Sequence, residues 1–497
     1  MVFSSVTFLI FFLPIALLLN FTARKITTKN AILLILSLIF YAWGEPVYVF
    51  LMMGSILINY LFGISIAQIT KVKIKKIVLG SAILLNLSVL FFFKYLGWAT
   101  ELILPLLSKI SFTPTIPEII LPIGISFYTF QIISYIVDVY RNPALCQKKL
   151  LNLGLYISFF PQLIAGPIVR YNEICDYIKE RKFELDTFVG GVERFIIGLG
   201  KKTLLANTFA FYADSVLNLN FSEYTSPYAW CAMLAYSLQI YFDFSGYSDM
   251  AIGLGKMFGF KFPENFNFPY AAKSITEFWR RWHISLSSWF REYLYIPLGG
   301  NRRGNVRTYF NIFLVFLATG IWHGAATNFL FWGLGHGLLR MVEKFLSGTN
   351  IAQKLSSTSY KPLTFALNIF KRIYTLSAII LLWIFFRNSM SDSIKIILKM
   401  AGINYTQFTD SPIEIIDSFN LSFIYSEKAI FPFLIGIFLT FPWWRVFSQK
   451  IQNLKNSNFW ASNLITIAKY TLLIIILILC ISSLASNAYN PFIYFRF

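Results

Sequence analysis

The sequence is poor in histidine and in acidic residues. Its 497 residues include three His, and 23 Asp and Glu stand against 43 Lys and Arg. It also lacks the glycine-rich loops that bind ATP or a dinucleotide and the G-x-S-x-G turn of serine hydrolases. These absences argue against those enzyme classes and leave histidine, together with bound substrates, as the source of any chemistry.

Cysteine is equally sparse. Cys146, Cys175, Cys231 and Cys480 are scattered and form no C-x-x-C pair, so neither a metal site nor a disulfide framework is indicated. Residues 1–5 lack the basic segment and cleavage site of a secretory signal, and the first apolar run is interpreted as a retained helix. The polar intervals are too short to form a soluble domain.

Apolar residues dominate the composition: 57% of the chain is hydrophobic, 13% is charged and 53 residues are Phe. A soluble core of this size cannot bury that much apolar surface. Runs near the roughly 20 residues that cross a bilayer recur along the chain. They lie at 8–21, 31–43, 47–69, 77–95, 309–322, 378–386 and 464–484. The sequence predicts an all-α polytopic membrane protein with one membrane-embedded domain over 1–497.

Loop charges predict an orientation. Basic residues gather at 24–29, 71–76 and 141–149, whereas the alternate loops at 44–46 and 100–118 nearly lack them. The positive-inside bias then places the N-terminus outside the cytoplasm, and basic residues before the last apolar run place the C-terminus there too. About twelve crossings follow. The net charge of +20 is assigned to a membrane surface, and no nucleic acid partner is expected.

Proline and glycine interrupt several apolar runs, as at 121–128 and 160–167. Broken helices at membrane depth are tolerated where protein or a water-filled cavity covers the freed backbone. We therefore expect re-entrant segments and an internal cavity or tunnel.

His323 lies between Trp322 and Gly324 at the end of an apolar segment. Desolvation there disfavours the imidazolium, so a neutral ring that acts as a general base is one interpretation. A hydrogen-bonded packing residue is the other. The third histidine, His336, is interpreted as packing.

His283 lies in an aromatic-rich amphipathic segment with Arg280 and Arg281, a pattern typical of a helix at the membrane interface. The arginines could meet a phosphate or a lipid headgroup, or serve only as anchors. For His283 the pattern leaves structural and catalytic roles open.

Asp243 and Asp249 lie in an otherwise apolar stretch. Buried carboxylates are costly unless they are paired or hydrogen-bonded. We favour a structural network with Ser245, Ser248 or Arg280 over a catalytic pair of acids.

At these residues the chain resembles the membrane-bound O-acyltransferase (MBOAT) family, and within it the bacterial alginate and peptidoglycan O-acetyltransferases. The matching segments are 1–5, 121–130, 163–167, 241–253, 274–304, 322–324 and 490–497. The resemblance implies a ring of transmembrane helices around a tunnel, which Asp243, Asp249 and Trp322 are candidates to line. It also implies a catalytic core at about 121–345 and a C-terminal helix and tail at 464–497.

The resemblance assigns roles to individual residues. It implies that His323 is the catalytic histidine, that His283 helps in positioning or proton transfer, and that Tyr494 holds the acyl group transiently. An aromatic anchor at the interface is the alternative for Tyr494. A phenol of pKa about 10 needs a base at neutral pH, which His323 could supply. Arg280 and Arg281 become candidates to bind a phosphate of coenzyme A.

The implied reaction moves acetyl from cytoplasmic acetyl-CoA, a substrate rather than a bound cofactor, to hydroxyls of an extracytoplasmic polysaccharide. The acceptor would be peptidoglycan or an alginate-like polymer, reached through a periplasmic or extracellular partner acetyltransferase. The expected location is the bacterial inner membrane, in contact with membrane lipids. Two alternatives stay open: D-alanyl transfer to teichoic acid or another acyl transfer, and a transporter built from broken helices and buried acids.

Overall fold

The regular elements of this protein are all helices in the part of the chain that the computed structural model describes. That part comprises residues 1–107, 109, 119–221, 223–349, 360–403, 427–443, 447–448, 451, 453, 459–486 and 490–491. No strand occurs within those ranges. The predicted all-α class is therefore confirmed.

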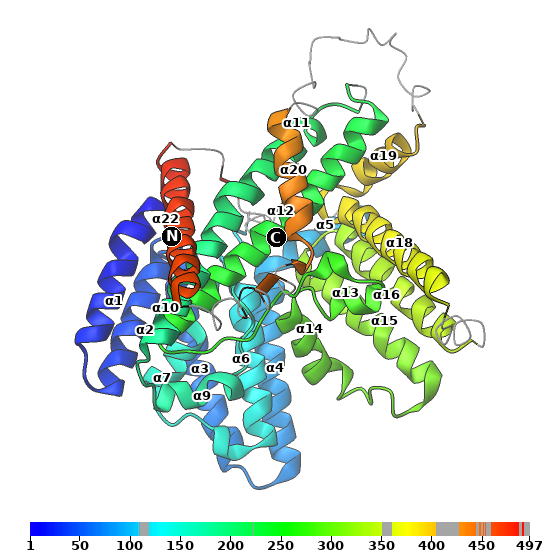
Figure 1. The fold of residues 1–497 in the computed structure, drawn as a ribbon. Coiled ribbons are helices and arrows are strands. Elements are labelled where there is room, and N and C mark those ends of the chain that lie inside the picture. Colours follow the sequence, from blue (N-terminus) through cyan, green and yellow to red (C-terminus); the bar gives the residue numbers. More distant parts are fainter. Residues whose placement is uncertain are drawn as a thin grey trace.

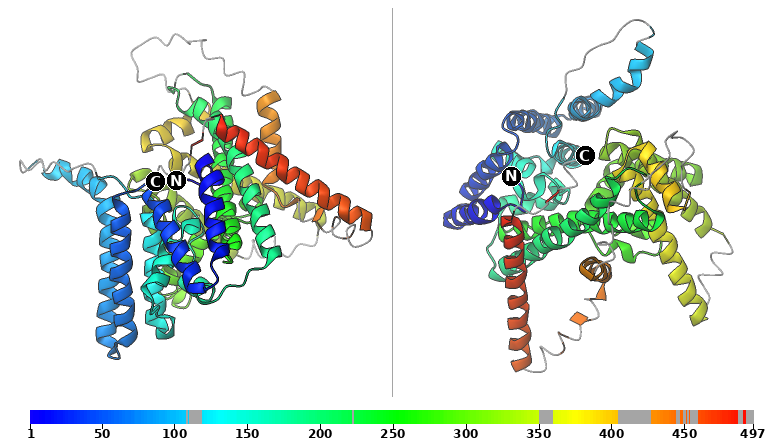
Figure 2. Two further views of the ribbon diagram at one scale, coloured as in Figure 1. Left: turned by 90° about the vertical axis from the view of Figure 1, so that its left-hand side faces the viewer. Right: turned by 90° about the horizontal axis from the view of Figure 1, so that it is seen from above.

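One long helix, α12 (Ser226–Met257), runs through the middle of the molecule and joins two groups of helices (Figures 1 and 2). Pro227 lies in its first turn, where a missing N–H leaves no helical hydrogen bond unmade. Its C-terminal half, including Tyr247 and Met250, packs into one hydrophobic core, and its N-terminal half, including Tyr236 and Leu238, packs into the other.

The first core is built largely by helices that precede α12. They are η1 (Phe8–Phe12), α1 (Leu13–Thr22), α2 (Ile26–Ala42), α3 (Tyr48–Gln68), α4 (Val72–Lys94), α6 (Ile125–Arg141), α7 (Leu150–Ser158), α8 (Phe160–Leu163), α9 (Tyr171–Lys179) and α10 (Leu185–Gly200). Two more elements on this side of α12 in the sequence are α5 (Leu96–Leu107) and η3 (Pro143–Leu145). The late helix α22 (Phe459–Ala485) returns to pack against α10.

The second core lies along the N-terminal part of α12. It is built from α11 (Asn207–Leu217), α13 (Ile275–Trp279), α15 (Gly304–His323), α16 (Thr327–Ser347), α18 (Lys361–Arg387), α19 (Met390–Met400) and α20 (Glu427–Leu439). Four short elements connect these helices: η4 (Lys201–Ala206), η5 (Pro269–Ala271), α14 (Ile284–Phe290) and η6 (Arg291–Tyr295).

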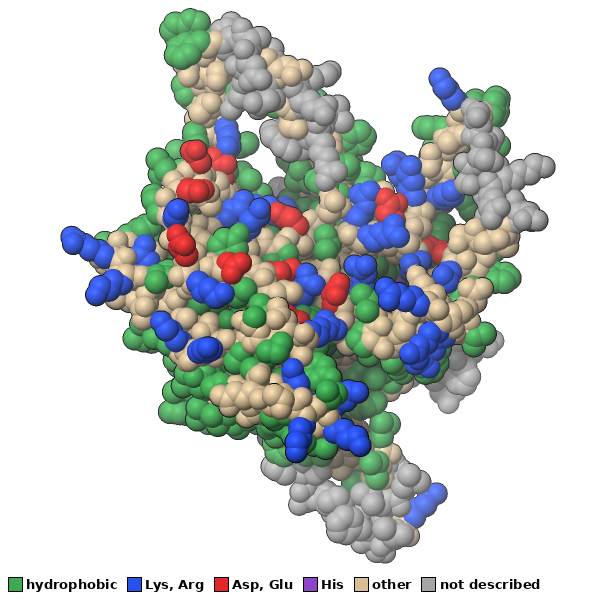
Figure 3. All heavy atoms as spheres, turned by 90° about the horizontal axis from the view of Figure 1, so that it is seen from below, with side chains coloured by type: hydrophobic (Ala, Val, Ile, Leu, Met, Phe, Trp, Pro, Cys, Tyr) green, Lys and Arg blue, Asp and Glu red, His purple; other side chains and the backbone are tan. Residues whose placement is uncertain are grey.

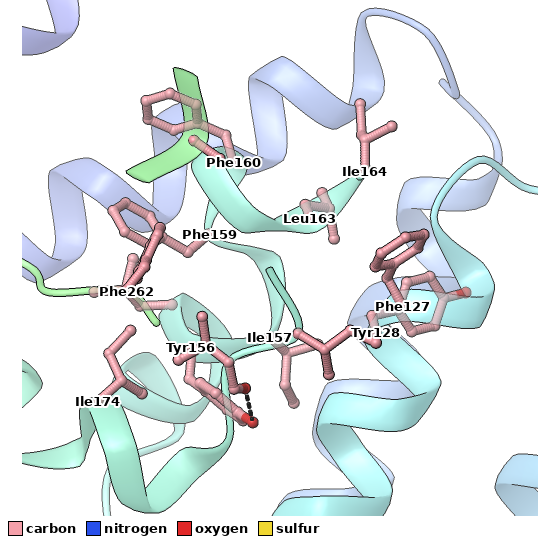
Figure 4. Packing of buried hydrophobic residues seen from close by; sticks show 14 of the residues in the cluster. Phe127, Tyr128, Tyr156, Ile157, Phe159, Phe160, Leu163, Ile164, Ile174 and Phe262 are labelled. Atoms are coloured by element: carbon pink, nitrogen blue, oxygen red, sulfur yellow. Dashed lines mark hydrogen bonds between the residues drawn. The ribbon is translucent and has the colours of Figure 1, made fainter. Parts of the chain in front are cut away.

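The broken segments predicted from proline and glycine are present. Gly124 has φ of 78°, a left-handed conformation that glycine adopts without strain, and α6 begins directly after it. Phe159 separates α7 from α8. Figure 4 shows the rings of Phe159 and Phe160 packed in this first core, where the Tyr156 hydroxyl donates to the carbonyl of Val169 at 2.9 Å. The break is thus covered by protein.

Four helices among the described residues are long and apolar enough to cross a membrane: α3, α4, α18 and α22. Only 11–33% of each apolar span is buried inside the molecule, so most of its apolar surface faces outward. A lipid environment accounts for such surfaces. Shorter apolar helices occur at Phe8–Thr22, Ile26–Ala42 and Ala429–Leu439. The protein is a membrane protein, and the count of twelve crossings stays a prediction.

A seam of four glycines joins α10 to α12. A methyl group at Gly198 would lie 2.6 Å from the carbonyl oxygen of Gly246, and one at Gly253 would lie 2.6 Å from that of Gly191. Each helix carries its pair seven residues, about two turns, apart. Small residues at this spacing let two helix backbones approach closely, as is common in membranes. The seam fixes the position of α12.

Candidate active site

His323 is brought into position by the hairpin of α15 and α16. A methyl group at Gly320 would lie 2.5 Å from the carbonyl oxygen of Phe329, and one at Gly333 would lie 2.6 Å from that of Phe316. These two glycines therefore allow the helices to touch along their backbones. His323, the last residue of α15, consequently lies against Trp332 of α16, with 4.8 Å between ring centroids.

Aromatic rings enclose the His323 imidazole. Besides Trp332, its neighbours are Trp322 at 4.8 Å and Phe386 of α18 at 5.1 Å between centroids. His323 is 4% exposed. Its Nδ1 and the indole nitrogens of Trp322 and Trp332 are buried without a hydrogen-bond partner in the described part of the chain. Buried polar atoms are normally hydrogen-bonded, so this group is suited to receive polar atoms of a substrate.

His283 lies close by, because its ring centroid is 6.0 Å from that of Trp322. Trp322 contacts both histidines. His283 has φ of 42° and ψ of 55°, a left-handed conformation, directly before α14. Such backbone is uncommon for residues other than glycine, and it clusters at functional sites.

The hydrogen bonds of Asn265 define the protonation of the His283 ring. Asn265 Oδ1 accepts from the Ser285 backbone N–H at 3.2 Å, which identifies that atom as the oxygen, and it lies 3.1 Å from His283 Nδ1. An amide oxygen only accepts, so Nδ1 carries the proton and donates. In the neutral ring, Nε2 is then a base with a free lone pair. It is buried and has no partner among the described residues.

Lys94, the last residue of α4, holds the C-terminal end of α15. Its ammonium donates to the carbonyl oxygen of Trp322 at 2.6 Å and lies 3.4 Å from the Ser126 hydroxyl. The neighbouring Tyr95 hydroxyl donates to the carbonyl of Ile321 at 2.7 Å. A cation at a helix C-terminus is electrostatically favourable. Lys94 and Tyr95 thereby fix the helical turn that carries His323.

His336 is held by packing contacts. Its Nδ1 accepts from the indole N–H of Trp279 at 3.3 Å, and its ring stacks on Phe278. It also contacts Trp332, with 5.1 Å between centroids. The third histidine is thus linked to His323 through one indole ring.

A basic cleft of about 1000 Å³ opens beside this aromatic layer. Its charged lining residues are Lys273, Arg280, Arg291, Arg340, Lys344 and Lys371, with Glu343 as the acid. Phe316 of α15 forms part of the wall. Phe316 precedes His323 by seven residues, about 10 Å along a helix axis. One wall of the basic cleft is therefore on the same helix as His323, and His323 itself is not among the lining residues.

The two predicted phosphate ligands are placed differently. Arg280 lines the cleft. Arg281 does not belong to its lining and instead pairs with Glu277 at 2.6 Å, one turn back along the chain. Its side chain also approaches the backbone carbonyls of Asn267 and Phe268 at 3.5 Å. Arg281 thus stabilises the loop that leads to α13.

Asp243 and Asp249 belong to ion pairs with adjacent lysines of η4. Lys202 lies 2.8 Å from Asp243, and Lys201 lies 2.6 Å from Asp249. Arg194 of α10 also contacts Asp249 at 2.6 Å. Both acids are paired, as a structural network requires, but with other partners than those that the sequence suggested.

The expected partners of the two acids lie elsewhere. The hydroxyls of Ser245 and Ser248 have no hydrogen-bond partner among the described residues. Arg280 forms no ion pair there, and it faces the cleft. The reason is geometric, since the π-helical turn of η4 sits beside this part of α12 and presents Lys201 and Lys202 to it.

Tyr494 lies outside the described residues. The two residues that are described nearest to it in the sequence are bound to the core. Asn490 accepts from the Asn207 amide at 3.2 Å and donates to the carbonyl of Ser4 at 3.3 Å. The Lys202 ammonium donates to the carbonyl of Pro491. The tail thus meets the core three residues before Tyr494.

Lys94 and Asn265 were missed by sequence reasoning. Lys94 is a charge at the end of an apolar run, and charges at membrane depth are candidates for functional sites. That signal could have identified it. Asn265 carried no such signal, because its role depends on contacts with His283 and Ser285 that the fold creates.

These features define a membrane-embedded protein with histidines at an enclosed site beside a basic cleft. Comparison with known proteins gives the class. The model of the membrane-bound O-acyltransferase (MBOAT) family matches residues 141–391, which include His283 and His323. The chain is 36% identical to the probable alginate O-acetylase AlgI of Pseudomonas putida over the full length of both chains.

Two further relatives carry related names. The chain is 37% identical to the peptidoglycan O-acetyltransferase of Helicobacter pylori, over 81% of this chain and 80% of the relative. It is 33% identical to the teichoic acid D-alanyltransferase of Bacillus subtilis, over 46% of this chain and 60% of the relative. This chain belongs to the membrane-bound O-acyltransferase family and is an acyltransferase. The transporter alternative is thereby set aside.

Proposed function

We propose that this enzyme takes acetyl from cytoplasmic acetyl-CoA and delivers it to hydroxyls of an extracytoplasmic polysaccharide. The observation that carries the proposal is the buried His323, whose Nδ1 and indole neighbours have no partner among the described residues. Such a site is equipped for a substrate that brings its own polar atoms. The names of the acetyltransferase relatives support acetyl as the acyl group.

The proposed chemistry uses His323 as a general base. His323 removes the proton of an attacking hydroxyl, whose oxygen forms a bond to the thioester carbon. The carbon–sulfur bond then breaks, and the leaving sulfur takes the proton from the imidazolium. His283 Nε2, a hydrogen-bond acceptor, assists in orienting the hydroxyl or moving the proton. Lys94 positions His323, because its ammonium binds the carbonyl of the preceding residue, Trp322.

Tyr494 is the proposed first acceptor. Acetyl would pass from a thioester to the phenyl ester of Tyr494 and then to an alkyl ester of the polymer. The acyl-transfer potential falls at each of these steps. The anchoring of Asn490 and Pro491 on Asn207 and Lys202 supports this role, because it brings the start of the tail to the core. A partner acetyltransferase outside the cytoplasm would take the acetyl onward to the polymer.

The basic cleft is the proposed entrance for the donor. Its cations suit the phosphates of coenzyme A, and Arg280 offers a planar guanidinium for them. Ring contacts connect the cleft wall to His323: Phe316 lies 5.4 Å from Trp279, Trp279 lies 5.8 Å from Trp332, and Trp332 lies against His323. Entry of the thioester therefore requires these rings to rotate. The tunnel, the ring of about twelve crossings and the placement of both termini outside the cytoplasm of an inner membrane belong to this proposal.

The acceptor is proposed to be peptidoglycan or an alginate-like polymer. Similarity to the two relatives named for these polymers extends over at least four fifths of this chain. Similarity to the teichoic acid D-alanyltransferase extends over 46% of it. The wider similarity favours acetyl transfer to a polysaccharide over D-alanyl transfer.

The test uses His323→Ala and Tyr494→Phe in the full-length protein. With acetyl-CoA, the parent should form an acetyl adduct in intact-mass spectra, and both variants should lack it. Polymer O-acetylation in cells should fall by about 100-fold or more in His323→Ala, the usual contribution of a general base. Wild-type O-acetylation in a correctly inserted His323→Ala variant would refute the assignment of His323 as the general base. Equal amounts of acetyl adduct in the parent and in Tyr494→Phe would refute Tyr494 as the first acceptor.

A further inference from the structure

A second cavity, of about 380 Å³, lies between α2, α7, α9 and the loop before α7. It shares no lining residue with the basic cleft. Among its lining residues are Thr27 and Asn30 of α2, Asn152 of α7 and Lys179 of α9. The loop contributes Lys148 and Lys149. Nothing in the proposed acyl transfer uses this cavity.

The electrostatics of the cavity favour an anion. Lys148 and Lys149 form no ion pair with any described residue, so their charges are uncompensated there. Lys179 is 3.7 Å from Asp176, but both side chains are exposed and this pairing is weak. The acid therefore offsets only part of the positive charge.

Two helices also begin at this cavity. The N-cap residues are Lys25 for α2 and Lys149 for α7, and neither side chain accepts a hydrogen bond from the first turn. The first N–H groups of an α-helix have no partner within the helix, and they carry a partial positive charge. Helices of 17 and nine residues thus direct two such termini to one place. Phosphate groups bind at such termini.

The side chain of Asn30 sets a second requirement for the ligand of this cavity. It is 2% exposed, and its amide nitrogen donates to Asn152 Oδ1 at 3.0 Å and to the carbonyl of Ile178 at 2.9 Å. Its Oδ1 is buried without a partner in the described part of the chain. That oxygen can only accept a hydrogen bond, so it is matched by a hydroxyl and not by a phosphate oxygen.

We propose that this cavity binds a glycerophosphate group, with its phosphate at Lys148, Lys149 and the start of α2 and a glycerol hydroxyl at Asn30. Two sources share this chemistry: the headgroup of an anionic lipid such as phosphatidylglycerol, and soluble glycerol phosphate. The lysine-bearing loop is one that the positive-inside bias assigns to the cytoplasm. Seen from below, Lys and Arg outnumber Asp and Glu on the face of the molecule (Figure 3).

The experiment compares the full-length protein with three variants. Lys148→Gln/Lys149→Gln removes the two free charges. Thr27→Glu places a carboxylate in the first turn of α2, where an acid favours the helix but repels the ligand. The control, Lys71→Gln/Lys73→Gln, removes two exposed lysines from the start of α4. Thermal unfolding confirms that each variant is folded.

Binding is measured in two arms. In the first, native mass spectrometry follows retention of phosphatidylglycerol against phosphatidylcholine from mixed nanodiscs. In the second, sn-glycerol 1-phosphate is titrated in neutral detergent. The parent and the control should bind in at least one arm, and both cavity variants should bind roughly tenfold or more weakly in that arm. Binding in the first arm alone identifies a lipid, and binding in the second alone identifies a soluble ligand. Equal binding by the parent and the cavity variants, or binding in neither arm, would overturn the proposal.

Discussion

Lys94 places a positive charge beside the candidate active site. Its ammonium is bound to the carbonyl of Trp322, and its centre lies 5.8 Å from the Trp322 ring centroid. The contact joins residues 228 positions apart in the sequence. Because Trp322 precedes His323, the lysine acts on the histidine through the backbone. We therefore propose that Lys94 is a positioning residue rather than a group that touches the reacting atoms.

We expect Lys94→Met to lower turnover by about 10- to 100-fold, since a hydrogen bond from a charged donor is worth roughly 1.5–3 kcal/mol. The KM for acetyl-CoA should change little, because Lys94 does not line the basic cleft. Steady-state kinetics of thioester cleavage measures both constants. Lys73→Met, on the exposed start of the same helix, is the matched control and should leave both unchanged. A raised KM with unchanged turnover would contradict a positioning role.

The residue types of the site were largely predictable, but their arrangement was not. Composition and motif drew attention to His283 and His323 because histidine is rare here. The tautomer of His283 depends on Asn265, 18 positions earlier, and becomes evident only from the hydrogen bonds. Arg280 and Arg281 look alike in the sequence, yet only Arg280 faces the cleft.

At the scale of helices, the glycine seam between α10 and α12 fixes the position of the central helix α12. Its four glycines bring the backbones of the two helices into contact, so a single methyl group has no room there. On the same helix, Gly190 has nothing within 4 Å of the position that a Cβ would take. The two positions therefore provide a matched pair of substitutions.

Gly198→Ala should destabilise the protein by about 1–3 kcal/mol, as overpacking of a tight interface does. Gly190→Ala should be neutral or stabilising by up to roughly 1 kcal/mol, because alanine favours a helix more than glycine does. Thermal unfolding in one detergent compares the two with the parent. A similar shift for both variants would show that helix propensity, and not the seam, governs the outcome.

The positions of these helices could be predicted from the apolar runs, because a membrane-facing helix must stay apolar along its length. The predicted run 77–95 corresponds to α4 (Val72–Lys94), and 464–484 corresponds to α22 (Phe459–Ala485). Helix ends differ by a few residues where basic residues extend a helix beyond its apolar part, as at the start of α4. The π-helical turn of η4 left no sequence signal, because it depends on packing against α12.

At the scale of the whole molecule, the candidate active site lies where the two hydrophobic cores meet. Trp322 belongs to the first core, whereas Trp332 and Phe386 belong to the second. The cations of the cleft come from separate segments, including η6, α16 and α18. Such convergence depends on which helices face each other, and no pattern along the chain predicts it.

Arg280→Gln should raise the KM for acetyl-CoA by roughly threefold to tenfold, since an exposed cation in an open cleft is partly screened. The effect should shrink at high salt, because screening already weakens the parent's binding there. Arg281→Gln is the control, and it should leave KM unchanged while lowering the unfolding temperature slightly. Kinetics at two ionic strengths provides the measurement. An equal rise in KM for both variants would place the donor elsewhere.

The hydrogen bond from Asn490 to Ser4 spans 486 positions of the sequence. A ribosome makes Ser4 early and Asn490 late, so this contact forms only after nearly every intervening helix has been inserted. Formation of this contact is therefore among the late steps in the assembly of the described fold. A chain that ends before Asn490 would lack this hydrogen bond, while Phe3, next to Ser4, would keep its stacking on Tyr247 of α12.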